Sequence, residues 1–191
     1  MQIKSLLLPL FLALILILST FGIILNSSED SSEAQTIEYN GYVYTQIPQG
    51  WKVKKDTITI LFHYTPQELA AMPNIASIPL ATLQQSRKMY IARSPLNDTS
   101  MAEAAFQGGI QPLLSIQAIP ACWEDGTGCE NKPLKSCKDA TDSEKVVVFK
   151  AANASETSIT YEDSCLAVST APETALQAIE ALLFRLLGFG P

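Results

Sequence analysis

The four cysteines are the most reactive residues of this sequence, and two kinds of site suit them. Cys122, Cys129, Cys137 and Cys165 can form two disulfides or a four-thiolate zinc site. Structural zinc ligands usually come as close pairs with about two to four residues between them. The gaps here are six, seven and twenty-seven residues. The spacing therefore favours disulfides and predicts no metal.

Four cysteines allow three pairings, and the sequence alone does not choose among them. We favour Cys122–Cys129, which closes the turn-rich segment 123–128, together with Cys137–Cys165. The chain-entropy model gives a stabilisation of about 2.5 kcal/mol for the shorter loop and about 3.6 kcal/mol for the longer one. Since small exported domains use such bonds as crosslinks, we predict that both are structural.

One histidine and a pair of carboxylates are the other candidates for chemistry. A single histidine, His63, cannot supply a multi-histidine metal site, and no nucleophile motif accompanies it. We expect it at a strand edge or on the surface. Glu124 and Asp125 lie beside glycines, but their spacing matches no calcium loop and favours an acidic turn. The sequence therefore predicts no catalytic residue and no cofactor.

Two asparagines in predicted loops match the glycosylation acceptor pattern, in which serine or threonine follows two residues later. They are Asn97 and Asn153. Acceptor asparagines belong in exported loops, so these candidate sites agree with an extracytoplasmic domain.

The chain begins with an apolar segment that predicts its cellular location. Residues 5–25 carry no charge, and a helix of about twenty residues spans about 30 Å, the hydrocarbon thickness of a bilayer. The alternative is a cleaved signal peptide, whose apolar stretch is usually about 7–15 residues long and ends near a small-x-small site. The nearest such site, at residues 32–34, lies well beyond the run. The pattern therefore favours a retained transmembrane signal-anchor.

Charge predicts the orientation of this anchor. Lys4 lies in the short segment 1–4 before the span, and only acidic charges follow it closely, so residues 1–4 are expected in the cytoplasm. Residues 26–35 are polar and acidic and predict a flexible tether. Residues 36–191 then form an extracytoplasmic domain of a single-pass protein of the cell membrane.

The exported part is acidic. All 19 acidic residues follow residue 25, against 12 of the 13 basic ones, which leaves a formal net charge of −7 there. Lys52, Lys54 and Lys55 form the densest basic cluster, and it is typical of a solvated strand end or turn. A nucleic-acid partner would need a basic face, so the composition argues against one.

Strands of the domain begin with a hairpin. Asn40-Gly41 lies between alternating residues and predicts a two-residue turn that pairs Tyr39 with Tyr42 and places Tyr44 on the same face. We expect this tyrosine face to pack in the core, although a ligand platform is an alternative. Residues 58–64 alternate as a third strand, and residues 88–93 predict another.

The second half of the domain predicts an antiparallel meander. Residues 145–150 form a β-branched run typical of a strand covered on both sides, and residues 157–161 and 166–169 follow as its partners. Helices are predicted to start at a capping box over residues 65–68, at Ser100 with Glu103, and at Thr170 with Glu173, with Gly188 ending the last. The expected fold class is α+β: antiparallel hairpins and a meander with packed helices and two disulfides.

Segments within residues 135–188 resemble small signal-anchored archaeal proteins of unknown function. These segments are residues 135–140, 146–149, 161–165 and 183–188. The resemblance covers the C-terminal third and includes no functional motif. It implies an archaeal surface address and no activity.

Three functions fit these observations. A non-enzymatic surface module that binds another macromolecule or organises the envelope leads, with the membrane and a protein at the cell surface as partners. A filament or pilus-like subunit is the alternative, because an apolar N-terminal helix ahead of a β-rich domain suits a filament core. A hydrolase using the carboxylates around Cys122–Cys129 comes third, so enzymatic activity is left open.

Overall fold

The computed structural model describes residues 34–95 and 98–190. The chain divides into two units, Met1–Gln35 and Thr36–Pro191, and the second is described below. The predicted n-region 1–4, anchor 5–25 and most of the tether 26–35 lie outside the described residues. Within the two described ranges, no helix combines the length and the apolar character needed to cross a bilayer.

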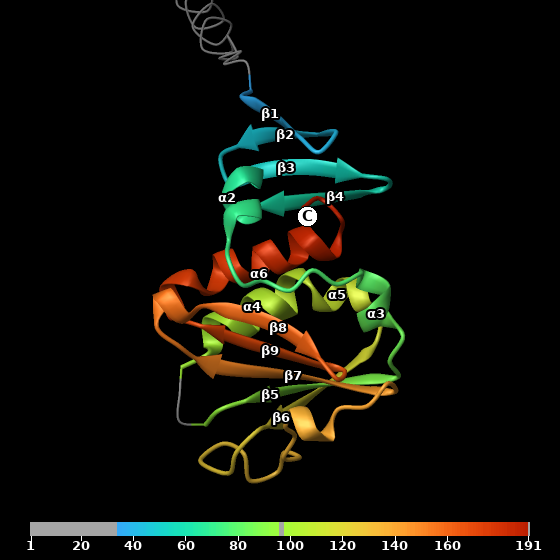
Figure 1. Cartoon of the computed structure of the whole chain (residues 1–191), viewed down its shortest axis with the longest axis vertical. Coiled ribbons are helices and arrows are strands. Elements are labelled where there is room, and N and C mark those ends of the chain that lie inside the picture. The colour runs from blue at the N-terminus through green and yellow to red at the C-terminus, as the bar shows by residue number, and fades with distance from the viewer. Residues whose placement is uncertain (1–33, 96–97, 191) are drawn as a thin grey trace, which may run out of the picture. The chain divides into compact units, whose positions relative to one another are not determined.

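A four-stranded antiparallel sheet opens the domain (Figure 1). Its strands, in spatial as well as chain order, are β1 (Thr36–Tyr39), β2 (Tyr42–Ile47), β3 (Gly50–Lys55) and β4 (Ile58–Phe62). The predicted hairpin is confirmed, because Tyr39 pairs with Tyr42. Asn40 and Gly41 have φ values of 49° and 78°, and positive φ at both central residues defines the turn that matches strand twist.

Strand β3 is an addition to the predicted hairpins, and the lysine cluster lies on it. Trp51 and Val53 are buried, whereas Lys52 and Lys54 between them are exposed. The cluster is therefore the outer face of a strand, and the predicted third strand is the fourth. Gly50 starts β3 with φ 138°, where a Cβ atom would lie 2.2 Å from a neighbouring carbonyl oxygen, so only glycine fits.

The tyrosine face packs in the core, as expected. Tyr44 is fully buried, and the ring of Tyr42 meets Phe189 edge-on at 4.7 Å between centroids. Tyr39 lies 5.8 Å from Phe184. The Tyr44 hydroxyl has no hydrogen-bond partner within the described residues, and burial raises the pKa of this phenol well above its usual value.

That hydroxyl yields a stability prediction. A buried donor without a partner costs about 1–3 kcal/mol in desolvation, so Tyr44→Phe is expected to raise the free energy of unfolding by about 1 kcal/mol. Urea unfolding of the two proteins side by side measures the difference. A loss of stability would instead show that the hydroxyl has a partner in solution.

The second sheet differs from the predicted meander. It contains β5 (Lys88–Arg93), β6 (Gln117–Cys122), β7 (Glu144–Ala151), β8 (Ser158–Glu162) and β9 (Cys165–Thr170), in the order β6-β5-β7-β9-β8. Strands β5, β6, β7 and β9 are parallel, and only β8 runs antiparallel to its neighbour β9. The predicted antiparallel meander is therefore wrong.

Burial explains this order. In β9, four of six residues are buried, and in β7 the run from Lys145 to Phe149 is buried throughout. Such strands need neighbours on both edges and covers on both faces. Strand β8 alternates between buried and exposed residues, which suits an edge. After β7 the chain therefore forms β8 at the edge of the sheet, and β9 then lies between β7 and β8.

Five α-helices accompany the sheets in the described part of the chain. They are α2 (Pro66–Ala71), α3 (Leu80–Gln84), α4 (Ser100–Gly109), α5 (Gln111–Leu114) and α6 (Pro172–Leu186). The capping box of α2 is confirmed. The caps of α4 and α6 are each shifted by one residue, to Thr99 and Ala171. Thr99 donates to Glu103 instead of capping the backbone, and Pro172 occupies the first turn of α6, so the residue before it becomes the cap.

Helix α6 lies between the first sheet and α4 (Figure 1), and its apolar residues are buried almost all round. It ends at Gly188, as predicted, with φ 70°. The amide of Phe189 donates to the carbonyl of Phe184 at 3.0 Å, which is the six-to-one bond of a Schellman motif. Lys55 of β3 donates to the carbonyl of Leu187, so the first sheet supplies a cation where the helix dipole favours one.

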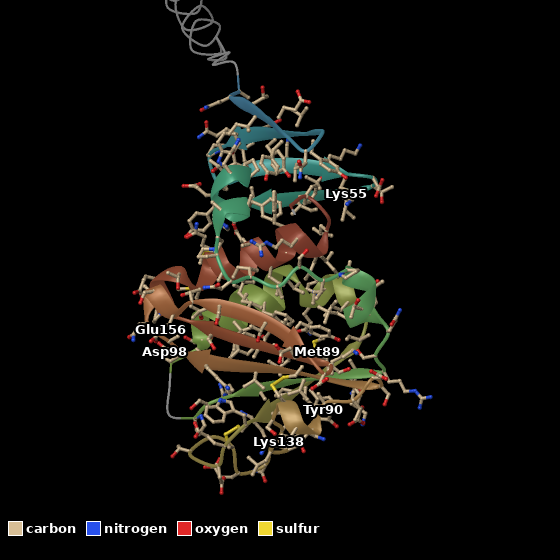
Figure 2. The ribbon with its side chains drawn as sticks, in the orientation of Figure 1. Lys55, Met89, Tyr90, Asp98, Lys138 and Glu156 are labelled. Carbon is tan, nitrogen blue, oxygen red and sulfur yellow. A yellow bond between two sulfur atoms is a disulfide. The ribbon has the colours of Figure 1, made fainter. Side chains whose placement is uncertain are left out.

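Both predicted disulfides are present. Cys122 is bonded to Cys129 and Cys137 to Cys165, and Figure 2 shows both as yellow bonds beside the second sheet. Residues 123–143, called the cysteine loop below, cover the sheet face opposite α4. A small second core forms there, with Tyr90 and Val148 buried against the loop. The general fold class is confirmed: the domain is α+β, with an antiparallel sheet, packed helices and two disulfides.

Candidate functional site

The connections that follow β5 and β6 leave the second sheet in opposite directions. After β5 the chain crosses one face through α4 and α5, whereas after β6 it follows the other face through the cysteine loop. Because β5 and β6 are parallel neighbours, this divergence opens a crevice at their carboxyl ends. Open sheets with parallel strands bind ligands at such a switch point.

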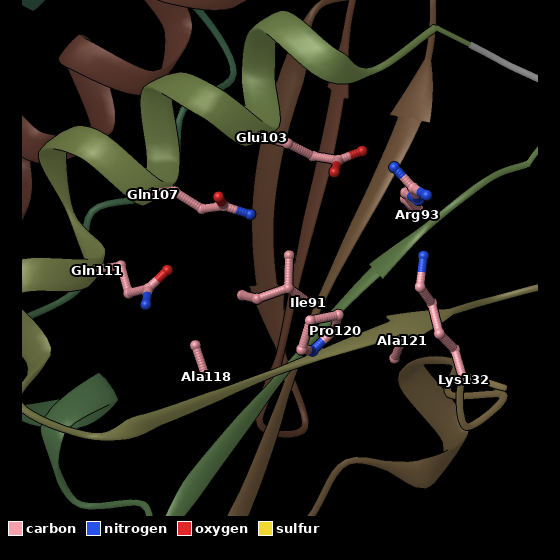
Figure 3. A pocket seen from close by; sticks show the side chains of 9 residues that line it. All are labelled: Ile91, Arg93, Glu103, Gln107, Gln111, Ala118, Pro120, Ala121 and Lys132. Carbon is pink, nitrogen blue, oxygen red and sulfur yellow. The ribbon is translucent and has the colours of Figure 1, made fainter. Parts of the chain in front are cut away.

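The crevice holds a cavity of about 380 Å³, and small-molecule sites usually measure about 300–1,000 Å³. Five long polar side chains surround an apolar floor (Figure 3). The polar ones are Arg93, Glu103, Gln107, Gln111 and Lys132, and the floor consists of Ile91, Ala118, Pro120 and Ala121. The site is therefore lined from β5, β6, α4, α5 and the cysteine loop together.

Strand alternation places Arg93. Met89, Ile91 and Arg93 point to the same face of β5, the face that α4 covers. The first two are buried, but Arg93 is exposed because it lies at the end of the strand, where the cover stops. Its carbonyl accepts a hydrogen bond from the amide of Trp123 at 3.2 Å, which fixes the backbone at the mouth of the crevice.

Helical spacing places the carboxylate and the amides. Glu103 and Gln107 are four residues apart and project from the same side of α4. The adjacent side of the helix, with Ala102 and Phe106, is buried against the sheet. The hydroxyl of Thr99 donates to Glu103 Oε1 at 2.7 Å, so the carboxylate is held at the mouth.

The first disulfide places Lys132. The Cys122–Cys129 bond closes the chain at the end of β6, and the amide of Lys132 donates to the carbonyl of Cys129 at 3.0 Å. The chain then returns beside β6, because the amide of Cys122 donates to Pro133 at 3.0 Å and the amide of Lys135 donates to Cys122 at 2.7 Å. The loop that carries Lys132 is thus tied to the strand on both sides.

The crevice carries an excess of positive charge. The ion pairs within the described part of the chain are His63–Glu180, Lys88–Glu144 and Lys135–Glu144. Neither Arg93 nor Lys132 takes part in one of them. Two cations and one carboxylate, Glu103, therefore line the crevice, and Glu130 lies near enough to Lys132 to interact with its charge. Guanidinium and ammonium donors suit a carboxylate or another oxyanion.

A smaller hollow of about 220 Å³ shares Arg93 and Glu103 with the crevice and extends toward the start of α4. Asp98 lies there, and its carboxylate accepts from the amide of Ser100 at 3.1 Å and from the hydroxyl at 2.6 Å. These bonds lower the pKa of Asp98. Its negative charge disfavours an anion in the smaller hollow, so the basic end of the larger cavity is the better place for one.

No protein-family model, curated protein or solved structure matches this chain. The function is therefore inferred from the geometry alone. The nine residues that line the larger cavity include no histidine, cysteine, serine or threonine. Its polar side chains are hydrogen-bond donors, amides and one carboxylate, which can hold a polar ligand.

The structure does not bring together the residues singled out from the sequence. His63 contacts Glu180 of α6. Glu124 accepts a hydrogen bond from the hydroxyl of Ser94, and the carboxylate of Asp125 accepts from the next backbone amide at 3.0 Å, as in the expected acidic turn. Among the described residues, no group of three or more His, Cys, Asp or Glu is placed to hold a metal ion.

Of the two candidate glycosylation sites, one can be placed. Asn153 is exposed in the connection between β7 and β8, next to the short helix η2 (Ala154–Glu156). Asn97 lies outside the described residues. The side-chain nitrogen of Asn153 donates to Glu156 at 3.1 Å, so this exposed hydrogen bond would have to open for modification.

Sequence reasoning missed the crevice. Glu103, Gln107 and Gln111 follow one another at four-residue intervals, and this spacing is the one local signal that could have indicated a polar helix face. Arg93 and Lys132 are far apart in the chain and meet only because of the parallel order of β5 and β6. No local pattern indicates such a meeting.

A serine and a lysine that the sequence did not single out also meet. Lys145 Nζ donates to Ser164 Oγ at 3.0 Å, and this hydroxyl donates to Asp142 at 3.1 Å. A serine beside a lysine resembles a nucleophile with its base. Both side chains are buried, and neither lines the crevice. We therefore read Lys145 and Ser164 as a buried hydrogen-bonded pair that supports the β8–β9 hairpin, with the exposed Asp142 at its outer end.

Proposed function

We propose that this chain is a membrane-anchored, extracytoplasmic binding module whose crevice holds a small carboxylate-bearing ligand. The apolar segment 5–25, Lys4 before it and the oxidised cysteines of the domain support the address. The observation that carries the binding function is the meeting of Arg93 and Lys132 at the carboxyl ends of parallel strands. Neither forms an ion pair with another described residue.

The crevice suits a ligand with an anionic end and a polar body. Arg93 and Lys132 would donate to the carboxylate, and charge-assisted bonds of this kind contribute about 1.5–3 kcal/mol each. The amides of Gln107 and Gln111 can donate to or accept from hydroxyl groups of the body. Glu103 lies among them and opposes a second negative charge beside it, which favours monocarboxylates over dicarboxylates.

The test uses the full chain in detergent micelles and titration calorimetry with glucuronate, gluconate and glutarate. We expect saturable binding of at least one monocarboxylate, and Arg93→Gln or Lys132→Gln is expected to weaken it by about tenfold or more. Lys54→Gln is the matched control, because it removes the same charge from the exposed face of β3, and it should leave the affinity unchanged.

Two results would contradict the proposal. One is the absence of binding by every carboxylate of the set, with the protein shown to be folded. The other is an equal loss in Lys54→Gln, which would mean that ligands respond to the overall charge of the domain and not to the crevice.

A further inference from the structure

A buried carboxylate lies in the middle of α6, the helix that packs on α4. Glu180 is 6% exposed, although its neighbours in the helix are apolar. Both of its oxygens contact His63, which follows β4. The backbone amide of His63 donates to Oε2 at 2.8 Å, and the ring Nδ1 lies 2.5 Å from Oε1. A buried carboxylate is costly unless it is hydrogen-bonded, and the two contacts with His63 meet that need.

The same contact orients the imidazole. With Nδ1 turned toward the carboxylate, the neutral ring donates from Nδ1 and keeps Nε2 as an acceptor. The His63 side chain is 54% exposed, so its far edge is open. Glu180 thus fixes a hydrogen-bond acceptor that no other described hydrogen bond occupies.

A cavity of about 270 Å³ adjoins this pair, between β4, α4 and α6. Its walls are otherwise apolar: Leu61, Ala105, Gly108, Gly109, Leu176, Ile179 and Leu183. His63 and Glu180 are therefore its only polar side chains.

Two consecutive glycines keep the cavity open. A glycine within a helix costs about 1 kcal/mol relative to alanine, yet Gly108 and Gly109 end α4 side by side. A Cβ atom at Gly108 would meet nothing within 4 Å, and one at Gly109 would lie 3.7 Å from Leu183. Neither glycine has a positive φ. Neither packing nor backbone conformation requires glycine there, and the space that they leave is part of the cavity.

We infer that this cavity is a second binding site, for a small apolar molecule with one hydroxyl group, such as an alkylphenol or a medium-chain alcohol. The apolar body would fill the space beside Gly108 and Leu183, and the hydroxyl would donate to Nε2 of His63. The carboxylate of Glu180 behind the ring disfavours an anionic head group. This site shares no lining residue with the crevice and does not depend on the function proposed for it.

The experiment follows methyl resonances of Leu and Ile in the full chain, held in lipid nanodiscs, during titration with 4-ethylphenol. Saturable shifts confined to the methyl groups of Leu176, Ile179 and Leu183 and to the His63 ring are expected. The matched anion, 4-ethylbenzoate, should bind about tenfold more weakly or worse. Because the readout is specific to each methyl group, partition of the phenol into lipid does not imitate binding.

Variants at one position separate filling of the cavity from helix stability. Gly108→Leu fills the space and is expected to weaken binding by about tenfold, while Gly108→Ala gains similar helix propensity but leaves most of the space and should retain binding. Glu180→Gln, which keeps the shape and removes the charge, should reduce the preference for the phenol over the benzoate. The inference is overturned by unsaturable shifts, by equal affinities in Gly108→Leu and Gly108→Ala, or by tighter binding of the benzoate.

Discussion

Replacing Phe184 with alanine is expected to lower the free energy of unfolding by about 4 kcal/mol, in the usual range for a fully buried phenylalanine. This ring of α6 is 0% exposed. Its centroid lies 5.8 Å from Phe62 and 5.7 Å from Phe189, and both Tyr39 and Tyr44 also contact it. The substitution leaves a cavity where the first sheet meets the helix.

Two tryptophans show which sheet is affected by this loss of unfolding free energy. Trp51 lies in the first sheet and Trp123 beside the second, so urea unfolding can be followed at each after the other is replaced by phenylalanine. Met101→Ala, at a position of α4 that is 53% exposed, is the control and should cost less than about 0.5 kcal/mol. A Phe184→Ala loss below about 1 kcal/mol would refute the central role given to α6.

Removing the longer crosslink is the second large effect. Cys137→Ala with Cys165→Ala frees a loop of sequence separation 28, and the loss expected from chain entropy is about 3.6 kcal/mol. The bond joins the short helix η1 (Cys137–Asp139) to the start of β9. It therefore holds the cysteine loop against the interior of the second sheet. Thermal unfolding of oxidised wild-type protein and of the double variant measures the difference.

The shorter crosslink serves as its comparison. Cys122→Ala with Cys129→Ala, at a separation of 7, is expected to cost about 2.5 kcal/mol. Lys132 depends on this bond for its position, so this variant should also weaken carboxylate binding, whereas the longer pair should affect mainly stability. A reversed order of stabilities, or equal effects on binding, would contradict these assignments.

Local signals in the sequence are sufficient where a few neighbouring residues decide the structure. Asn40-Gly41 encodes its turn, residues 65–68 encode a capping box, and Gly188 encodes a helix end. Each of these depends on backbone geometry or on hydrogen bonds between near neighbours. The pairing of the cysteines, by contrast, was left open by the sequence, and the structure agrees with the pairing that the turn-rich segment between the first two favoured.

Parallel pairing has no comparable local signal. The buried run of β7 correctly indicated cover on both faces, yet the sequence could not show that β9 and β5 are its neighbours. The crevice could not be predicted for the same reason, because Arg93 and Lys132 become neighbours only through that strand order. Likewise, His63 was expected at an edge, but its partner Glu180 is 117 residues away, hidden in a helix that reads as apolar.

The position of α6 has a consequence for biosynthesis. Chains are made from the amino terminus, and domains tend to fold as their segments emerge. Every strand of the described domain precedes α6 in the chain, so the first sheet still lacks its apolar cover until α6 has left the ribosome. The nascent protein must therefore remain soluble while the apolar face of the first sheet is uncovered. A chaperone that binds unfolded chains would be most useful while the C-terminal residues are being synthesised.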